Sequence, residues 1–309
     1  MHPFTKNLRL SVSALGEEKL IAAIRHWLGS ASPRAPFGIG DDCAVVPAGR
    51  AAQLITVDPV IYGEHFNDTV PPRAAGEKLF KRNLSDIAAM GGRPRAAVLA
   101  LALDSRVKLA WLEQFYRGLA AVSRRYRVPI VGGDIAHHKG GIVATLTLVG
   151  ESSPARVVTR TGARLGDWIF VSGTLGNSLR SGHHWNFAPR LAEGQWLARQ
   201  CDVRAMLDVS DGLAKDLRAL APRGAVPALD RAALPLRAGA DMRAALTDGE
   251  DYELVFALAA RADRAAFIRA WRKKFPRTKL SCLGRFVRPD SLPADALNLA
   301  DFRGFEHLR

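Results

Sequence analysis

The sequence is poor in the features that mark secreted, membrane-spanning and zinc-binding proteins. It has only three cysteines in 309 residues, Cys43, Cys201 and Cys282, and they form neither a metal-spaced pair nor an even disulfide set. No apolar run is long enough to cross a bilayer, and the first 20 residues lack the apolar centre of a signal peptide. These absences predict a cytoplasmic protein that does not bind a membrane.

Acidic residues are scarce relative to basic ones. The chain has 44 Lys and Arg against 30 Asp and Glu, which gives a formal net charge of +14. Such a surface attracts anions, either small ones such as nucleotides or large ones such as nucleic acid. The basic residues are dispersed, and no helix-turn-helix, zinc-finger or RNA-recognition signature accompanies them. We therefore expect a solvated basic surface with a small-anion site, and no nucleic acid partner.

The sequence is rich in regular hydrophobic periodicity. Helical spacing appears at residues 16–29, 73–92, 108–126 and 261–275. Short apolar runs typical of strands appear at 52–58, 95–104, 128–134, 141–150, 168–172 and 279–286, and residues 205–220 and 249–258 each contain a strand. The alternation predicts an α/β (α+β) protein. Its length favours two packed domains, residues 1–150 and 151–309, without a low-complexity linker.

Acidic residues recur at one kind of position, beside a glycine turn or at the expected end of a strand. They are Asp42, Asp58, Asp134, Asp208 and Asp211. Ser210 and Asp211 are suited to cap the helix that follows them. Carboxylates at strand ends can converge at one edge of a sheet, where such oxygen ligands suit Mg²⁺ together with substrate phosphates. A single such Asp is more often a cap or turn residue, but their recurrence beside glycines predicts a magnesium-phosphate site.

Seven motifs in order along residues 38–258 resemble those of thiamine-monophosphate kinases. They are "GIGDDCAVV", "TVD...GEHF", "NLSDIAAMGG", "VGGD", "TRTGARLGDWIFVSGTLGNS", "DVSDGLAKDL" and "GEDYELVF". The segment "DFRGFEHL" resembles the end of those proteins. The family belongs to the superfamily of aminoimidazole-ribonucleotide synthetase. The resemblance implies a two-domain fold whose N-terminal strands pair across a homodimer into a barrel, with a C-terminal α/β domain that completes the nucleotide and substrate site.

The resemblance also implies an activity and a set of site residues. The activity is transfer of the ATP γ-phosphoryl group to thiamine phosphate, with several Mg²⁺ ions. The implied metal positions are Asp42, Thr56, Asp58, Asp86, Asp134, Asp208 and Asp211. The implied ATP positions are Tyr116, Gly133, Asp134, Arg160 and Ser210, and the implied substrate positions are His65, Glu250 and Phe302. No catalytic nucleophile is expected, because the acceptor is the substrate's own phosphate oxygen, whose low pKa makes a strong base dispensable.

Several of these residues have an equally simple structural interpretation. His65 could pack at a strand end, Phe302 in the core, and Tyr116 against the core from its helix. Two further carboxylates in "GEDYEL", Asp251 and Glu253, are interpreted as turn and surface residues.

Two pairs of histidines, at 137–138 and 183–184, are expected in loops. Adjacent residues do not share a helix face, so we do not expect either pair to bind a metal.

The chain departs from the family pattern near the expected acceptor site. Val57 stands where a hydroxyl residue is usual, and Asn177 stands where an aspartate is usual. The segments 135–141 and 183–197 also differ. Two hypotheses remain: a working thiamine-phosphate kinase, or a diverged nucleotide-binding relative that uses another small anionic acceptor or is not catalytic. The seven acidic and hydroxyl metal positions favour catalysis.

Overall fold

The computed structural model describes residues 2–15, 17–33, 51–153, 156–297 and 299–305. Contacts divide the chain into two compact units. The N-terminal unit comprises Met1–Leu84 and Pro94–Glu151, and the C-terminal unit comprises Ser85–Arg93 and Ser152–Arg309. In the described part of the chain, no helix has the length and apolar character needed to cross a membrane.

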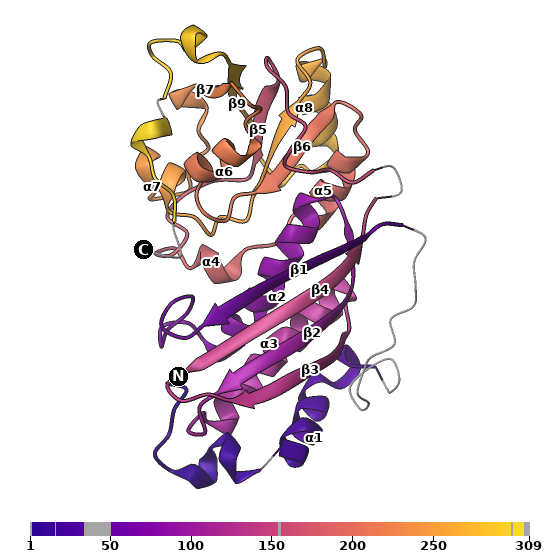
Figure 1. Cartoon of the computed structure of the whole chain (residues 1–309), viewed down its shortest axis with the longest axis vertical. Coiled ribbons are helices and arrows are strands. Elements are labelled where there is room, and N and C mark those ends of the chain that lie inside the picture. The colour runs from indigo at the N-terminus through magenta and orange to yellow at the C-terminus, as the bar shows by residue number, and fades with distance from the viewer. Residues whose placement is uncertain (1, 16, 34–50, 154–155, 298, 306–309) are drawn as a thin grey trace. The chain divides into compact units, whose positions relative to one another are not determined.

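Helices and strands alternate through the first half of the chain, as the hydrophobic periodicity predicts (Figure 1). They are α1 (Glu17–Leu28), β1 (Gln53–Ile61), α2 (Pro72–Ala89), β2 (Arg93–Leu103), α3 (Leu109–Tyr126), β3 (Ile130–His137) and β4 (Ile142–Glu151). Short 3-10 turns cover Leu8–Leu10, Val12–Ala14 and Gly29–Ala31. The four strands form one sheet in the order β1-β4-β2-β3, with β1 antiparallel to β4 and β2 parallel to β3.

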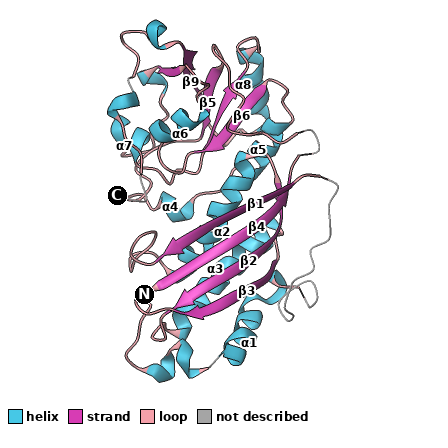
Figure 2. Ribbon diagram, viewed as in Figure 1, coloured by secondary structure: helices cyan, strands magenta, loops and turns pink. Residues whose placement is uncertain are grey.

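Helices α2 and α3 cover one face of this sheet (Figure 2). The inward side chains of β2 and β4, such as Leu99, Leu101 and Leu146, are buried beneath them. The opposite face is open: Ile55 and Val57 of β1 are 69% and 58% exposed, and Val98 of β2 is also exposed. The N-terminal sheet therefore has an apolar face that the described residues of its own unit leave exposed.

Two carboxylates that we predicted at strand ends lie inside strands. Asp58 is within β1, because the strand continues through Pro59, which an edge strand tolerates. Asp134 is within β3, because the preceding glycines do not break the strand. A Cβ atom on Gly133 would lie 2.0 Å from the Leu99 carbonyl oxygen, so glycine permits the close pairing of β3 with β2. The expected strand ends at these two positions are wrong.

The second half of the chain forms a five-stranded sheet in the order β6-β8-β5-β9-β7, in which all described pairs are antiparallel. Its strands are β5 (Trp168–Ser172), β6 (Val203–Asp208), β7 (Val226–Leu229), β8 (Leu254–Leu258) and β9 (Leu280–Val287). Its helices are α4 (His183–Asn186), α5 (Leu191–Ala198), α6 (Leu213–Leu220), α7 (Met242–Thr247) and α8 (Arg264–Lys274). Short 3-10 turns cover Arg231–Ala233, Pro289–Ser291 and Leu299–Asp301.

Both faces of the C-terminal sheet are covered. On one face, Val255 of β8 joins a buried aliphatic cluster with Leu217 of α6. On the other face, Phe256 stacks on Phe170 at 5.5 Å between ring centroids and also contacts Trp271 of α8. Because successive strand residues point to opposite faces, all five residues of β8 are buried.

Candidate functional site

An acidic turn, residues 208–212, connects β6 to α6 in the C-terminal unit. The strand ends at Asp208, as predicted, and α6 begins at Leu213. Asp208 Oδ2 accepts a hydrogen bond of 2.6 Å from the hydroxyl of Ser85, in the last part of α2. Gly212, at φ 103°, takes the position before the helix, and no side chain caps α6 there. The expectation that Ser210 and Asp211 cap this helix is therefore wrong, because the chain needs the left-handed freedom of glycine at that point.

Asp216, which the sequence analysis did not single out, lies beneath the acidic turn. Its buried carboxylate accepts a hydrogen bond from the Asp211 N–H at 3.1 Å. Burial, and then the charges of Asp208 and Asp211, raise the pKa of Asp216 to about 8. Asp211 itself forms an ion pair with Lys215 at 2.8 Å. Asp208, Asp211 and Asp216 thus make this turn locally acidic, and the repulsion between such carboxylates favours a cation nearby.

An acidic loop, residues 248–253, is tied to the acidic turn through its backbone. The N–H of Glu250 donates to Ser210 O, and the N–H of Tyr252 donates to Val209 O, each at 2.8 Å. Glu250 and Tyr252 both have left-handed backbones, at φ 54° and 51°. Such conformations are costly for residues with a side chain and persist where the surroundings impose them. The two backbone bonds thus hold Glu250 beside the acidic turn.

Two other carboxylates of the acidic loop are buried, which contradicts their interpretation as turn and surface residues. Asp251 accepts from Arg237 at 2.7 Å and from the Gly176 N–H at 3.0 Å. Burial raises the pKa of Asp251 to about 7, although the nearby Arg237 opposes this change. Glu253 accepts from Arg190 Nε at 2.7 Å and from a strand hydroxyl. These residues can be buried because basic partners, remote in the sequence, supply their hydrogen bonds.

The C-terminal segment lies against the same turn. The Phe305 N–H donates to Asp211 O at 2.8 Å, and a Cβ atom on Gly304 would lie 2.3 Å from that oxygen. Phe302 is partly buried, packs against the aliphatic core of the C-terminal unit, and accepts a hydrogen bond on its carbonyl from Arg218 at 2.6 Å. The acidic turn, the acidic loop and the C-terminal segment therefore converge within one unit.

The structure accounts for the departure at Asn177. Its backbone is left-handed, at φ 56°, a conformation that asparagine tolerates better than most residues. Its side-chain amide donates to Ala238 O at 2.9 Å, and its N–H donates to Asp248 Oδ2 at 2.8 Å. An aspartate has no N–H to offer Ala238, so the amide is favoured by local hydrogen bonding.

The predicted site residues of the N-terminal unit lie on opposite edges of its sheet. Thr56 and Asp58 are on β1, and Gly133 and Asp134 are on β3. Two strands separate β1 from β3, which corresponds to about 14 Å at ordinary strand spacing. Arg82 of α2 lies 3.7 Å from Asp58. A single sheet thus does not bring Asp58 and Asp134 to one edge, contrary to the sequence-based expectation.

His65 and Tyr116 occupy structural positions. His65 Nδ1 accepts from the Ile61 N–H at 3.2 Å, and its carbonyl accepts from Lys78 at 2.7 Å, which fixes the turn after β1. Tyr116 is buried in α3 with its ring centroid 5.9 Å from that of Trp27, and burial raises the pKa of its hydroxyl. Both positions correspond to the structural alternatives considered from the sequence.

The remaining predicted residues differ in setting. Asp86 lies in the last part of α2, next to Ser85, and is half-buried. Arg160 is exposed on the segment before β5. Asp42 lies outside the described residues. The described part of the chain contains no ready-made group of three His, Cys, Asp or Glu side chains arranged to hold a metal. A magnesium ion does not require one, because it is usually held by one or two carboxylates with waters and phosphates.

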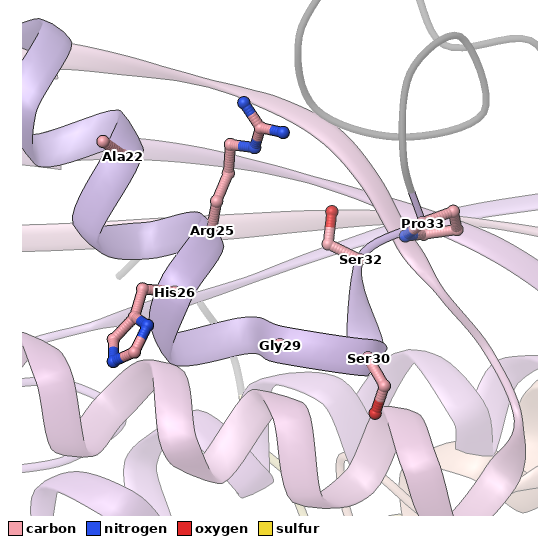
Figure 3. A pocket seen from close by; sticks show the side chains of 7 residues that line it. All are labelled: Ala22, Arg25, His26, Gly29, Ser30, Ser32 and Pro33. Atoms are coloured by element: carbon pink, nitrogen blue, oxygen red, sulfur yellow. The ribbon is translucent and has the colours of Figure 1, made fainter.

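A hollow of about 580 Å³ lies at the end of α1 in the N-terminal unit. Arg25 and Ser32 point to one side there, whereas His26 and Ser30 point to the other (Figure 3). None of the predicted site residues that the structure describes lines this hollow. Its side chains do not converge on a common point, so it does not form a candidate reaction site.

Comparisons with known proteins show which proteins this chain resembles. Residues 40–152 match the family model described as AIR synthase related protein, N-terminal domain. The chain is 36% identical to the thiamine-monophosphate kinase of Synechococcus elongatus, covering 80% of this chain and 83% of that protein. It is 32% identical to the thiamine-monophosphate kinase of Salmonella typhimurium, covering 95% and 98% respectively.

Solved structures give the same result. The crystal structure of thiamine-monophosphate kinase from Stenotrophomonas maltophilia aligns with a TM-score of 0.73 at 28% identity, over 86% of this chain and 93% of that one. The structure described as AaThiL complexed with AMPPCP and TMP aligns with a TM-score of 0.66 at 30% identity, over 90% and 92%. The hydrogenase maturation protein HypE in complex with ATP, at 19% identity and a TM-score of 0.72 over 94% and 92%, shares the fold.

Proposed function

The chain belongs to the thiamine-monophosphate kinase family, and from that premise we propose that it transfers the γ-phosphoryl group of ATP to thiamine phosphate, giving thiamine diphosphate. The observation that carries the proposal is the convergence of the acidic turn, the acidic loop and the C-terminal segment around Asp211. A relative of this fold binds AMPPCP, an ATP analogue, together with TMP. The acidic groups of the C-terminal unit suit a reaction in which anionic phosphates must approach each other, because they can hold the cations that reduce the repulsion between phosphates.

The carboxylates would hold Mg²⁺ together with the phosphates. In the C-terminal unit the proposed ligands are Asp86, Asp208 and Asp211, and a cation there fits the gathering of Asp208, Asp211 and the buried Asp216 at one turn, where burial and then the neighbouring charges raise the pKa of Asp216. In the N-terminal unit they are Thr56, Asp58 and Asp134, with Asp42 outside the described residues. When bound, magnesium supplies neutralisation of phosphate charge. The protein's own task is to fix these oxygens in place before the substrates arrive.

The nucleotide and the acceptor use different parts of the chain in this proposal. Gly133, Arg160 and Ser210 would contact ATP, through an open backbone at Gly133 and a cation at Arg160. Glu250, Phe302 and His65 would line the acceptor site, although His65 and Tyr116 also have structural roles. No side chain acts as a nucleophile, since a phosphate oxygen of thiamine phosphate attacks the γ-phosphorus and ADP leaves. Residues 1–150 and 151–309 would form the dimerisation and substrate-completing domains.

We also propose that the protein is a homodimer through its N-terminal sheet. The exposed apolar face carries Ile55, Val57 and Val98, and a patch of this kind in a folded protein calls for a partner. The edge strands β1 and β3 would pair across the dimer to close a barrel, which removes the unpaired edges. Light scattering at micromolar protein concentration tests this, and a monomeric mass would refute it.

The decisive experiment is incubation of the purified protein with ATP, Mg²⁺ and thiamine phosphate, with the product identified by mass. Formation of thiamine diphosphate and ADP in equal amounts is expected, and excess EDTA should abolish both. Unphosphorylated thiamine serves as the control acceptor and should give no diphosphate. ATP consumption without thiamine diphosphate would instead favour a relative that acts on another small anionic acceptor.

A further inference from the structure

A segment that departs from the family pattern packs directly on the acidic loop. This clamp segment, residues 183–187, forms α4 and the residue after it. His183 Nε2 lies 2.9 Å from the Asp251 carbonyl oxygen. The Phe187 ring stacks on Tyr252 with centroids 4.0 Å apart and an angle of 19° between the ring planes. The contacts are close enough for the clamp segment to restrict the conformation of the loop.

The carboxylate of Glu250 is approached at both of its oxygens. The Tyr252 hydroxyl donates to Oε1 at 3.4 Å, and Nδ1 of His184 lies 3.5 Å from Oε2. His184 is buried, and the Glu250 side chain retains 21% exposure. The exposed part of this side chain is where a ligand can approach it.

The backbone of Glu250 is already committed to one conformation before a ligand arrives. Its left-handed backbone is unfavourable for a residue with a side chain, and the bond to Ser210 O fixes it nonetheless. With both carboxylate neighbours in place, the side chain also loses rotamer freedom during folding and not during binding. A group that is ordered in advance in this way binds more tightly, because less entropy remains to be lost.

We propose that His184 and Tyr252 are positioning residues that hold the Glu250 carboxylate for the organic end of the acceptor. The inference rests on the proposed function. Thiamine phosphate has an aminopyrimidine, a cationic thiazolium ring and an anionic phosphate. A fixed carboxylate accepts from the amino group, attracts the thiazolium charge and repels the phosphate. Glu250 therefore orients the acceptor with its organic end on the acidic loop and its phosphate away from it.

The test separates acceptor binding from ATP binding. His184→Ala should raise the KM for thiamine phosphate about 10-fold, since it removes the neighbour of Glu250 Oε2 and leaves the carboxylate to be ordered during binding. The kcat and the KM for ATP should stay within twofold. His184→Asn, whose amide nitrogen can take the place of Nδ1, should restore most of the affinity. Asn186→Ala, an exposed change on the same helix, is the matched control and should behave as wild type.

A double-mutant cycle tests whether His184 acts through Glu250. In a Glu250→Gln background, His184→Ala should cause no further rise in KM. Tyr252→Phe, which keeps the stacking on Phe187, provides a second variant if His184→Ala folds poorly, and should raise the same KM about threefold. Unchanged KM, equal rises in both KM values, or additive effects would overturn the inference while the function stands. A wild-type protein without thiamine diphosphate formation would overturn the proposed function and the inference with it.

Discussion

The two sheets of this protein differ in how completely their own units cover them. In the C-terminal sheet, β8 is buried along its whole length between an aliphatic cluster and an aromatic one. In the N-terminal sheet, α2 and α3 cover one face, while Ile55 and Val57 are exposed on the other. The described residues of the C-terminal unit therefore cover both faces of their sheet, whereas those of the N-terminal unit leave apolar surface exposed.

The largest effect on stability should come from a mutation in the core of the C-terminal unit. Phe256→Ala removes a fully buried ring that contacts both Phe170 and Trp271, and should lower the free energy of unfolding by about 3–5 kcal/mol. Leu179→Ala, an exposed apolar position of the same unit, should change it by less than about 0.5 kcal/mol. Urea unfolding followed by circular dichroism measures both. Equal losses would mean that burial in this sheet does not determine stability.

The next effect separates function from stability within the well-packed unit. Asp208→Asn keeps the acceptor oxygen for the Ser85 hydroxyl but removes one charge from the acidic turn. Turnover with thiamine phosphate should fall about 100-fold or more, because charge stabilisation by bound metal has that magnitude. The melting temperature without ligands should stay equal or rise, since the repulsion acting on Asp216 decreases. Wild-type turnover would remove Asp208 from the site.

A charge on the exposed face of the N-terminal sheet tests the proposed dimer interface. Ile55→Lys should weaken self-association at least about tenfold, because it places a charge in a surface that is proposed to be covered. Leu165→Lys, on an apolar residue of similar kind in the C-terminal unit, should leave the mass by light scattering unchanged. Val57→Thr, which adds a hydroxyl but no charge to the same face, should weaken self-association much less than Ile55→Lys. An Ile55→Lys protein that dimerises like wild type would refute this interface.

The smallest effect concerns a buried carboxylate that orders the N-terminal unit. Asp104 accepts from Arg106 at 2.8 and 2.9 Å and from the Gly140 N–H at 3.0 Å, and these bonds hold its pKa well below the usual range. A lowered pKa stabilises the fold above the unfolded value of 3.8, and this stability is lost as pH falls below it. Asp104→Asn should cost about 1 kcal/mol at pH 7 and progressively less below pH 4. A pH-independent difference in thermal melts would contradict this.

Local periodicity predicted the regular elements well and the short ones poorly. Long amphipathic patterns identified α1, α2, α3 and α8, and continuous apolar runs identified β2 and β4. The short elements β7 and α7 were not predicted, because four to six residues carry too little periodicity and are stabilised by the elements on which they pack. The extent of β1 and β3 was also missed, since edge position and parallel pairing are properties of the sheet and not of the local sequence.

The candidate site was predictable only in part. Asp208 and Glu250 stand out by motif, and the structure brings their segments together. Asp251 was interpreted as a turn or surface residue, because its burial depends on Arg237, which local sequence does not reveal. Asp216 was not singled out. A signal for Asp216 did exist: it lies one helical turn after the start of α6, on its buried side. The contact of His184 with Glu250 cannot be predicted from the local sequence, since the two residues are 66 positions apart and meet only in the folded chain.

The left-handed backbone at Glu250 has a consequence for directed evolution. A glycine there would relax the strained φ of 54° and remove a partly buried charge, and the relief of about 1 kcal/mol offsets the entropy cost of glycine. Selection for heat resistance alone would thus tolerate Glu250→Gly, although the change deletes the proposed acceptor ligand. A library screened by melting temperature would drift toward inactive proteins at this position, so thermostabilisation of this chain requires Glu250 to be held fixed or activity to be selected in parallel.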